Sequence, residues 1–354
     1  MRVFFADPFW YVPVLLIAGF LALSYHLGKF IFYQVLRYRG VRAWKQKDFP
    51  RAGHYFARLV NAGVWPVSHW RFYLGWSYML QAGGKPKTEA AALFYQATEL
   101  FAEVDRKIPD SPLTLQNWGL TLLELALISP GTEQSLLNEA GDKFARFLAL
   151  QPEEGMIHYC WGYALYKQAK RAEGERQREL LQQAQSKLEQ AEKLLPEHYD
   201  TLNQLGVIYK NMVEYLPSSE QGELYALALA KHRKATELEP KKYLSWGNWG
   251  LALMGQAVIS TEVKREMLFA EAQEKLLQAE ALQPGSSAYN LACLAARRGQ
   301  LESCQAWLEA AARADTLQDR NYAWADPDLA SVREYDWFIN LPWPVEPRLE
   351  EAPA

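Results

Sequence analysis

The sequence has little cysteine and lacks the short motifs that usually carry catalysis or metal binding. Three cysteines, Cys160, Cys293 and Cys304, are an odd and sparse set. Such a set argues against a disulfide framework and suits a reducing compartment. No HExxH, CxxC or GxxxxGK[ST] pattern occurs. The formal net charge is only −3 over 354 residues, which gives no reason to expect nucleic acid as a partner. We therefore expect a non-enzymatic protein without a metal or cofactor.

An apolar run near the start of the chain predicts a membrane helix. Residues 9–28 read FWYVPVLLIAGFLALSYHLG and carry no formal charge. As a helix, twenty such residues span the roughly 30 Å of bilayer hydrocarbon. A cleavable signal peptide and a buried helix are the alternatives. Arg2 is offset by Asp7, and no small-residue cleavage site follows the run, so a retained anchor within residues 1–36 is favoured.

The charges after this run predict its orientation. Only one acid, Asp48, falls between residues 29 and 51. The basic residues of the same segment are Lys29, Arg37, Arg39, Arg42, Lys45, Lys47 and Arg51. An excess of lysine and arginine on one flank marks the cytoplasmic side of a membrane helix. We expect a single-pass protein of the inner (cytoplasmic) membrane, with the rest of the chain in the cytoplasm.

A phrase of bulky residues around a glycine recurs along the chain, as in QNWGLTLL (116–123) and LNQLGVIY (202–209). Its glycines are Gly75, Gly119, Gly162, Gly206 and Gly250, and Ala292 holds the equivalent place in a sixth copy. A second phrase follows each first one, with an alanine, a bulky residue four places on and a proline, as in Ala184, Leu188 and Pro196. Two phrases that both recur about every 44 residues are typical of stacked helix pairs, in which glycine permits close helix approach.

The two phrases resemble the tetratricopeptide repeat (TPR) family, whose unit has about 34 residues. LNQLGVIY (202–209) and AYNLACLA (288–295) match its first helix. Five units depart from the family by about ten extra polar residues between the phrases, for example at 167–183. The resemblance implies an all-α fold, a right-handed superhelical solenoid of helix-turn-helix repeats, here preceded by one N-terminal transmembrane helix.

The chain then divides into five predicted segments. The anchor (1–36) is followed by a degenerate first repeat and juxtamembrane basic segment (37–66), in which Ala52, Phe56 and Ala57 point inward. A solenoid of about six repeats covers 67–315. A helix within 316–341 caps its last apolar face, because an open end would meet water. The proline-rich residues 342–354 are expected to be a disordered tail.

The resemblance implies that the first helix of each repeat lines a concave groove that binds proteins. The predicted groove residues are Gln116, Asn117, Tyr159, Tyr163, Tyr166, Asn203, Lys210, Asn248, Tyr289, Asn290 and Arg297. Amides can hold a peptide backbone, and tyrosines add amphipathic contact. As an alternative, Asn117, Asn248 and Asn290 hold helix pairs together. Leu113 and Leu244 stand where a two-carboxylate clamp of this family needs lysines.

These features predict a membrane-anchored scaffold or adaptor that recruits or assembles components of a membrane complex through its groove. The partner is a protein that the sequence does not identify. The alternative is a permanent structural subunit, packed through its membrane helix, where Ala18, Ala22 and Gly28 would allow close helix approach. An enzyme would need a convergent set of titratable groups, and no such set is apparent in the sequence.

Overall fold

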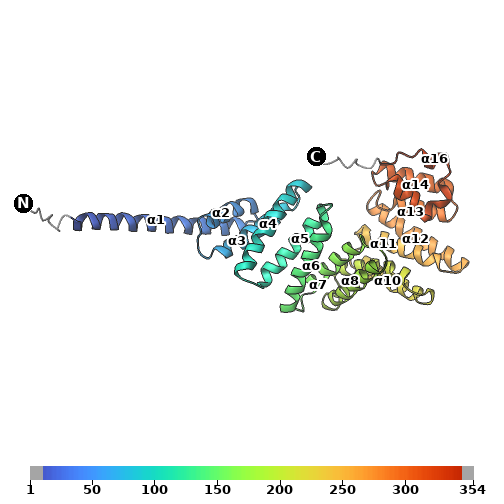
Figure 1. The fold of residues 1–354 in the computed structure, drawn as a ribbon. Coiled ribbons are helices and arrows are strands. Elements are labelled where there is room, and N and C mark those ends of the chain that lie inside the picture. Colours follow the sequence, from blue (N-terminus) through green and yellow to red (C-terminus); the bar gives the residue numbers. More distant parts are fainter. Residues whose placement is uncertain (1–10, 345–354) are drawn as a thin grey trace, which may run out of the picture. The chain divides into compact units, whose positions relative to one another are not determined.

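The computed structural model describes residues 11–344, with side chains from residue 18 onward, and every regular element in this range is a helix (Figure 1). The chain forms two compact units, which meet in sequence between Pro152 and Glu153. We call residues up to 152 unit 1 and residues from 153 unit 2. The boundary lies inside the predicted solenoid segment 67–315.

Unit 1 is a series of helices in which each packs against the next. They are α1 (Tyr11–Lys45), α2 (Phe49–Asn61), α3 (Val67–Ala82), α4 (Lys87–Lys107), α5 (Pro112–Ile128) and α6 (Glu133–Leu150). Short turns join them, so neighbouring helices form the hairpins α1–α2, α3–α4 and α5–α6.

Unit 2 continues the hairpin pattern and ends in three short helices. Its long helices are α7 (Gly155–Ala169), α8 (Gly174–Leu194), α9 (Tyr199–Met212), α10 (Ser218–Leu238), α11 (Tyr243–Val258), α12 (Glu262–Leu282), α13 (Ala288–Arg297) and α14 (Leu301–Arg313). The three short helices at its end are α15 (Arg320–Ala325), η3 (Pro327–Val332) and α16 (Asp336–Ile339), and a further short helix, η2 (Val213–Tyr215), lies between α9 and α10. The predicted all-α helical repeat solenoid is confirmed, whereas its handedness stays a prediction.

In the hairpins that carry a phrase glycine, the two helices approach most closely at that glycine, as the sequence predicts. A Cβ atom added at Gly119 would lie 2.6 Å from the Phe144 ring, closer than real side chains approach. The second helix therefore contacts the backbone of the first. Leu188 and Leu276 occupy the position of Phe144 in the hairpins of Gly162 and Gly250. The two phrases pack together because the glycine of the first leaves space beside its helix, and the bulky residue of the second fills that space.

The hairpin α1–α2 has the same contact, which the sequence analysis did not identify. A Cβ atom at Gly40 would lie 2.8 Å from the Phe56 ring. Ala52 and Phe56 are fully or almost fully buried, and Ala57 is partly buried. One helix runs from Tyr11 to Lys45, so the first helix of this hairpin is continuous with the segment before it.

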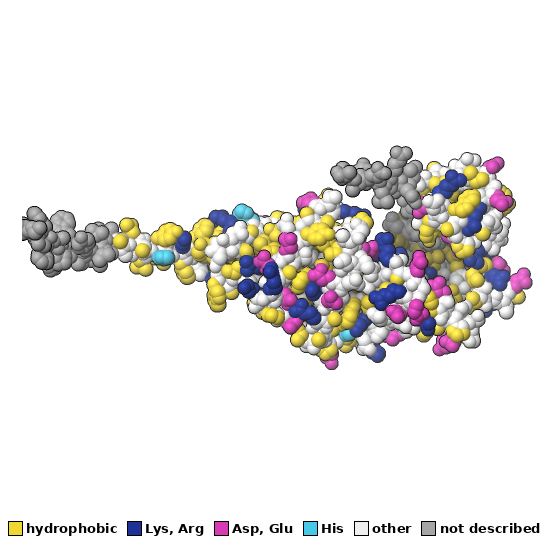
Figure 2. Space-filling view, in the orientation of Figure 1, with side chains coloured by type: hydrophobic (Ala, Val, Ile, Leu, Met, Phe, Trp, Pro, Cys, Tyr) yellow, Lys and Arg dark blue, Asp and Glu magenta, His cyan; other side chains and the backbone are white. Residues whose placement is uncertain are grey.

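The part of α1 that precedes this hairpin carries exposed apolar side chains. Phe20, Leu23 and Phe30 are each more than half exposed, and Leu36 is the first buried residue. Figure 2 shows apolar side chains along this rod-like segment. Within the described part of the chain, no helix combines the length and hydropathy needed to cross a membrane. The predicted span 9–28 begins outside the described residues and is not confirmed.

The extra residues of the long units lengthen the second helices. Helices α4, α8, α10 and α12 have 21 residues each. Most of the inserted segment 167–183 forms the start of α8, and only residues 170–173 separate α7 from α8. The insertion therefore extends a helix and leaves the turn short.

A lysine on the second helix covers the aromatic ring that precedes the phrase glycine. Lys143 Nζ lies 3.9 Å from the centroid of the Trp118 ring, and Lys187 Nζ lies 3.8 Å from that of Trp161. In the hairpin α9–α10 the aromatic position holds Leu205, and Lys231 instead pairs with Glu192 at 2.6 Å. These cations cover apolar rings while they stay near water.

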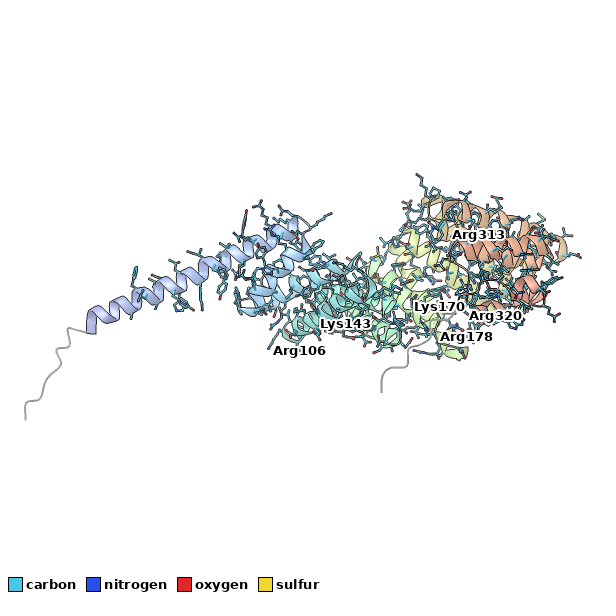
Figure 3. All side chains as sticks on the ribbon, turned by 90° about the horizontal axis from the view of Figure 1, so that it is seen from above. Arg106, Lys143, Lys170, Arg178, Arg313 and Arg320 are labelled. Atoms are coloured by element: carbon cyan, nitrogen blue, oxygen red, sulfur yellow. The ribbon has the colours of Figure 1, made fainter. Side chains whose placement is uncertain are left out.

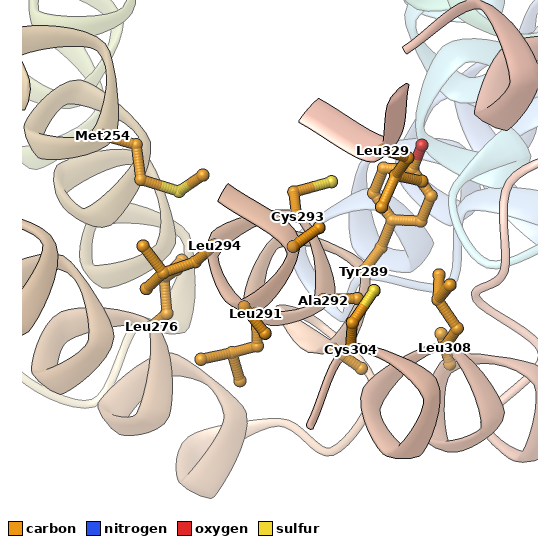
Figure 4. Close-up of a cluster of buried hydrophobic side chains, with 14 of the residues drawn as sticks. Met254, Leu276, Tyr289, Leu291, Ala292, Cys293, Leu294, Cys304, Leu308 and Leu329 are labelled. Atoms are coloured by element: carbon orange, nitrogen blue, oxygen red, sulfur yellow. The ribbon is translucent and has the colours of Figure 1, made fainter. Parts of the chain in front are cut away.

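The end of unit 2 is closed by the three short helices. Leu329, Val332 and Phe338 are fully buried, and η3 packs against α13. Figure 4 shows Cys293 and Cys304 among the apolar side chains of this cluster, which also contains Tyr289 and Leu308. All three cysteines of the chain are buried.

Candidate functional site: a cavity in unit 2

A cavity of about 970 Å³ lies in unit 2. Its walls come from α7, α8, α9, η2, α10, α11, α13, α15 and η3, and they combine charged, amide and apolar side chains. Residues that line it include Tyr166, Lys210, Asn211, His232, Asn248, Met254, Arg297 and Asp328. This volume is at the upper end of the range of ligand pockets in proteins, roughly 300–1,000 Å³.

Lys210 is the cation most deeply set in this cavity. It lies on α9, one helical turn after Gly206, and is only partly accessible. Burial lowers the pKa of Lys210, whereas the charges of Glu214 and Asp328 oppose that change. Its ammonium group forms no ion pair with any described residue. A cation held away from water without a partner is costly, and such groups are frequent at functional sites.

The other charged groups of the cavity differ from Lys210. Arg297 of α13 pairs with Asp328 of η3, so these two charges satisfy each other. Glu214 and Lys170 are exposed, and water can solvate them. Figure 3 labels Lys170 just past the end of α7. Lys210 is therefore the charge of this cavity that gains most from a ligand.

His232 lies beside Lys210 in the same wall. Its side chain is fully buried, and a Cβ atom at Gly206 would lie 2.5 Å from its ring. Neither ring nitrogen has a hydrogen-bond partner among the described residues. Burial, with a smaller contribution from the Lys210 charge, lowers the pKa of His232 to about 3. The imidazole is therefore neutral near pH 7, in a position where other hairpins carry phenylalanine or leucine.

Amide and phenol side chains also line the cavity, among them Tyr166, Asn211 and Asn248. Tyr166 of α7 interacts with Asn211 of α9, and burial raises the pKa of Tyr166. Asn248 of α11 donates from Nδ2 to Asn203 Oδ1 at 3.1 Å, and Ser245 donates to the same oxygen at 3.0 Å. The contact between Asn203 and Asn248 therefore joins α9 to α11, which is the role that the alternative interpretation gives to Asn248. The amide oxygen of Asn248 stays available to a ligand.

The predicted groove residues fall into three groups. Tyr166, Lys210, Asn248 and Arg297 line the cavity. Tyr159, Tyr163, Asn203, Tyr289 and Asn290 belong to unit 2 but do not line it. Gln116 and Asn117 belong to α5 of unit 1.

Several residues outside the cavity have structural contacts. The Tyr289 hydroxyl donates to Asp326 at 2.9 Å, and the Tyr159 and Tyr163 rings stack. Asn117 is buried and donates to the Leu113 carbonyl of its own helix at 2.8 Å. The sequence analysis did not select His232 or Asp328. A histidine at an apolar position of the second phrase was the available signal for His232.

A cluster of Cys293, Asp326 and Asp328 has ligand atoms within 4.8 Å of one another, a spacing that a metal ion could use. Its groups already have partners, because Asp326 accepts from the Tyr289 hydroxyl and from the Asp328 backbone N–H, which caps η3. Burial raises the pKa of the Cys293 thiol, so the thiolate that a metal binds is disfavoured. The arrangement is that of a helix cap.

Comparisons with known proteins find likeness only among solved structures. Neither a family model nor a curated protein matches the chain. MamA (41-end) from Desulfovibrio magneticus RS-1 is 18% identical over 59% of this chain and 97% of that chain, with a TM-score of 0.42. YrrB, described as a TPR protein with an unusual peptide-binding site, is 18% identical over 61% and 92%, with a TM-score of 0.41.

A third similar structure is the human IFIT1 dimer with m7Gppp-AAAA. It is 12% identical over 77% of this chain, with a TM-score of 0.46, and the match spans 58% of the IFIT1 chain. Likenesses this distant carry no argument about what the chain binds. The repeat architecture rests on the chain's own helices and glycine contacts.

Proposed function

We propose that this chain is a membrane-anchored interaction scaffold that binds a segment of another protein in the cavity of unit 2. The observation that carries the proposal is the cavity of about 970 Å³, with a deeply set, unpaired Lys210 in its wall. The hairpins around it are TPR-like, with lengthened second helices. We take the function to be binding, because the other titratable groups of the cavity are paired, solvated or neutral.

The lining suits an extended polypeptide. Asn211 and Asn248 offer amides, which can both donate to and accept from a peptide backbone. Tyr166 and Met254 offer surface for apolar side chains, and methionine adapts to varied shapes. Polar groups that fix the backbone beside apolar surface that accepts side chains are the usual elements of peptide recognition.

Membrane anchoring is supported by the first part of α1. Large apolar side chains that point to all sides of a helix need an apolar environment, which water does not offer. Trp65, in the turn between α2 and α3, is 83% exposed and lies beside Arg37, which donates to its carbonyl oxygen. An exposed tryptophan near basic residues is typical of a membrane–water interface. We propose an inner-membrane anchor with the helical units on the cytoplasmic side.

Anchoring would raise the effective concentration of the cavity for partners at the same membrane. A scaffold of this kind can recruit or assemble components of a membrane complex without catalysis. A permanent structural subunit is the second candidate, and the open surroundings of Gly19 and Gly28 on α1 favour it, because partner helices could pack there. A subunit keeps a fixed stoichiometry with its complex in mild detergent, whereas a scaffold is substoichiometric.

Photo-crosslinking in intact cells tests the binding proposal. A benzophenone amino acid replaces Val258, which lines the cavity and is 47% exposed, so the change is tolerated. The matched control is Lys234, an exposed residue of α10 outside the cavity. We expect discrete crosslinked polypeptides from position 258, and we expect that position 234 gives none of the same products. The same products from both positions, or none at 258, would contradict the proposal.

Cysteine labelling tests the sidedness. The native cysteines are buried, so Ser219→Cys introduces an accessible thiol at an exposed position of α10. We expect a membrane-impermeant maleimide to label it only after the cells are lysed, and alkaline carbonate to leave the protein in the membrane pellet. Labelling of intact spheroplasts would reverse the sidedness, and release by carbonate would contradict the anchor.

A further inference from the structure

We propose that the segment bound in the cavity of unit 2 carries a carboxylate that pairs with Lys210. The inference rests on the proposed function and names the chemistry of its ligand. The carboxylate belongs to an aspartate or glutamate side chain, or to a peptide C-terminus, and the experiment below separates these sources. The inference adds to the proposed binding role, because it makes the charge of Lys210 the feature that selects the partner.

The positive charge of Lys210 has no partner within the described cavity wall. Its ammonium is partly buried and has no ion pair among the described residues, whereas Arg297 in the same cavity is paired with Asp328. Burial of an unpaired cation costs free energy, which an arriving anion can recover. A charge-assisted hydrogen bond in such a setting is stronger than a neutral one.

His232 independently provides a second unsatisfied polar group in the same wall. This side chain is fully buried, lines the same cavity and has no hydrogen-bond partner for either ring nitrogen among the described residues. Lys210 follows Gly206 by one helical turn, and the His232 ring lies against Gly206, so both groups belong to one wall. A carboxylate held by Lys210 brings an acceptor toward the imidazole N–H, whose hydrogen-bonding capacity is otherwise unused.

The balance of charge favours a singly charged ligand. The lining holds three cations, Lys170, Lys210 and Arg297, and two anions, Glu214 and Asp328. Glu214 and Asp328 both act on Lys210 electrostatically, and the neutral imidazole adds no further positive charge. A carboxylate neutralises the remaining charge, whereas a phosphate dianion would meet repulsion from the two acids. We therefore expect carboxylates to be preferred to phosphorylated side chains.

The test uses the full chain in detergent micelles and a library of random octapeptides with amidated C-termini. We expect the selected peptides to share an aspartate or glutamate at one position. Replacement of that acid by its amide should weaken binding at least about tenfold, because hydrogen bonds to charged groups are worth roughly 1.5–3 kcal/mol. Matched peptides that carry phosphoserine at that position, or only a free C-terminal carboxylate, form the other arms.

Variants of the chain complete a double-mutant cycle. Lys210→Gln should weaken the acidic peptide by the same factor and leave the amide peptide unchanged, so that the two changes do not add. Lys210→Arg should retain the preference, and Lys234→Gln, outside the cavity, should bind like the parent chain. Thermal melting confirms that each variant is folded, and Lys210→Arg keeps the test decisive if Lys210→Gln unfolds.

Each outcome has one meaning. Selection of no peptide from the amidated library or from the same library with free C-termini would overturn the proposed function, and with it this inference. Peptides without a shared acid, or acidic peptides that bind Lys210→Gln undiminished, would overturn the carboxylate alone and leave peptide binding intact. Tighter binding of phosphoserine than of glutamate would overturn the charge argument. A preference carried only by the free C-terminus would assign the carboxylate to a chain end.

Discussion

The hairpins α5–α6 and α9–α10 have the same construction but different chemistry at their centres. In the first, Gly119 contacts the ring of Phe144, and Lys143 covers Trp118. In the second, Gly206 contacts the ring of His232. There the aromatic position is a leucine, and the lysine pairs with Glu192 of the preceding hairpin instead.

The difference shows how a repeat can specialise without a change of fold. A hairpin needs a flat or branched side chain to fill the space left by the glycine, and imidazole meets this requirement almost as well as phenyl. The polar ring adds nitrogen atoms that the core does not satisfy, and they lie in the wall of the cavity. The hairpin α5–α6 is therefore optimised for packing, whereas α9–α10 gives up some stability beside the candidate site.

The largest expected effect is at Phe144. Phe144→Ala should lower the free energy of unfolding by about 3–5 kcal/mol, because it removes a fully buried ring and leaves a cavity. His232→Ala should cost clearly less, because it also removes two unsatisfied polar atoms. Urea unfolding followed by circular dichroism measures both. Equal losses of stability would mean that Phe144 and His232 stabilise their hairpins equally, which would contradict the difference drawn between the two hairpins.

The glycine contacts come next in size. Gly119→Ala and Gly206→Ala should each cost about 1–3 kcal/mol, because the new methyl group meets the facing ring. Gly222→Ala is the control, since Gly222 lies within α10 with open space around its Cβ position. There alanine should raise stability by about 0.5–1 kcal/mol through helix propensity. A loss at Gly222 as large as at Gly119 would refute the packing explanation.

His232→Phe makes the second hairpin resemble the first. It should raise the free energy of unfolding at pH 7 by about 1–2 kcal/mol, because an apolar ring replaces unpaired polar atoms. A chemical unfolding curve of this variant beside the parent chain measures the gain. If His232→Phe is less stable than the parent, the imidazole must have partners that compensate for its burial.

The same substitution should change the dependence of stability on pH. His232 has a pKa of about 3 in the folded chain, below the ordinary value of 6.5, so only the unfolded chain binds its proton between these values. Stability should therefore fall as the pH drops below about 6.5, by up to about 1.4 kcal/mol per pH unit. His232→Phe should lose about 2 kcal/mol less than the parent between pH 7 and pH 5. Parallel pH profiles would contradict the neutral, buried state of His232.

The smallest expected effects are at the two lysines. Lys143→Met and Lys231→Met should each lower stability by about 0.5–1 kcal/mol. Lys143 loses its cation–π contact and a long ion pair with Glu139 (3.8 Å), whereas Lys231 loses a short ion pair with Glu192 (2.6 Å). In 0.5 M salt the loss at Lys231 should shrink, because salt screens partly exposed ion pairs. A larger salt sensitivity at Lys143 than at Lys231 would contradict this assignment.

The hairpins are well predicted from the sequence because the residues that show the repeat period are also the ones that form the contact between the two helices. Gly119 and Phe144 are visible as a small and a bulky residue at repeating positions, and their packing follows. Gly40 was missed because it precedes Gly75 by 35 residues, outside the period of the other copies. The span predicted for residues 9–28 lies partly outside the described residues and remains a proposal.

The candidate site was predicted only in part, because a cavity depends on side chains brought together from many elements. Lys210 and Asn248 were selected from the face of the first helices, and both line the cavity. Tyr289 was selected by the same rule, but its hydroxyl is held by Asp326, a residue 37 positions later. No periodicity encodes such a pairing. His232 was overlooked because its position in the second phrase indicates core packing.

The most direct test of the account is the structure of the full chain with a peptide selected from the amidated library. The account predicts that the peptide lies in the cavity between Tyr166 and Asn248, with its carboxylate against Lys210 Nζ. A peptide bound elsewhere on the molecule, or one that leaves Lys210 without a partner, would contradict it.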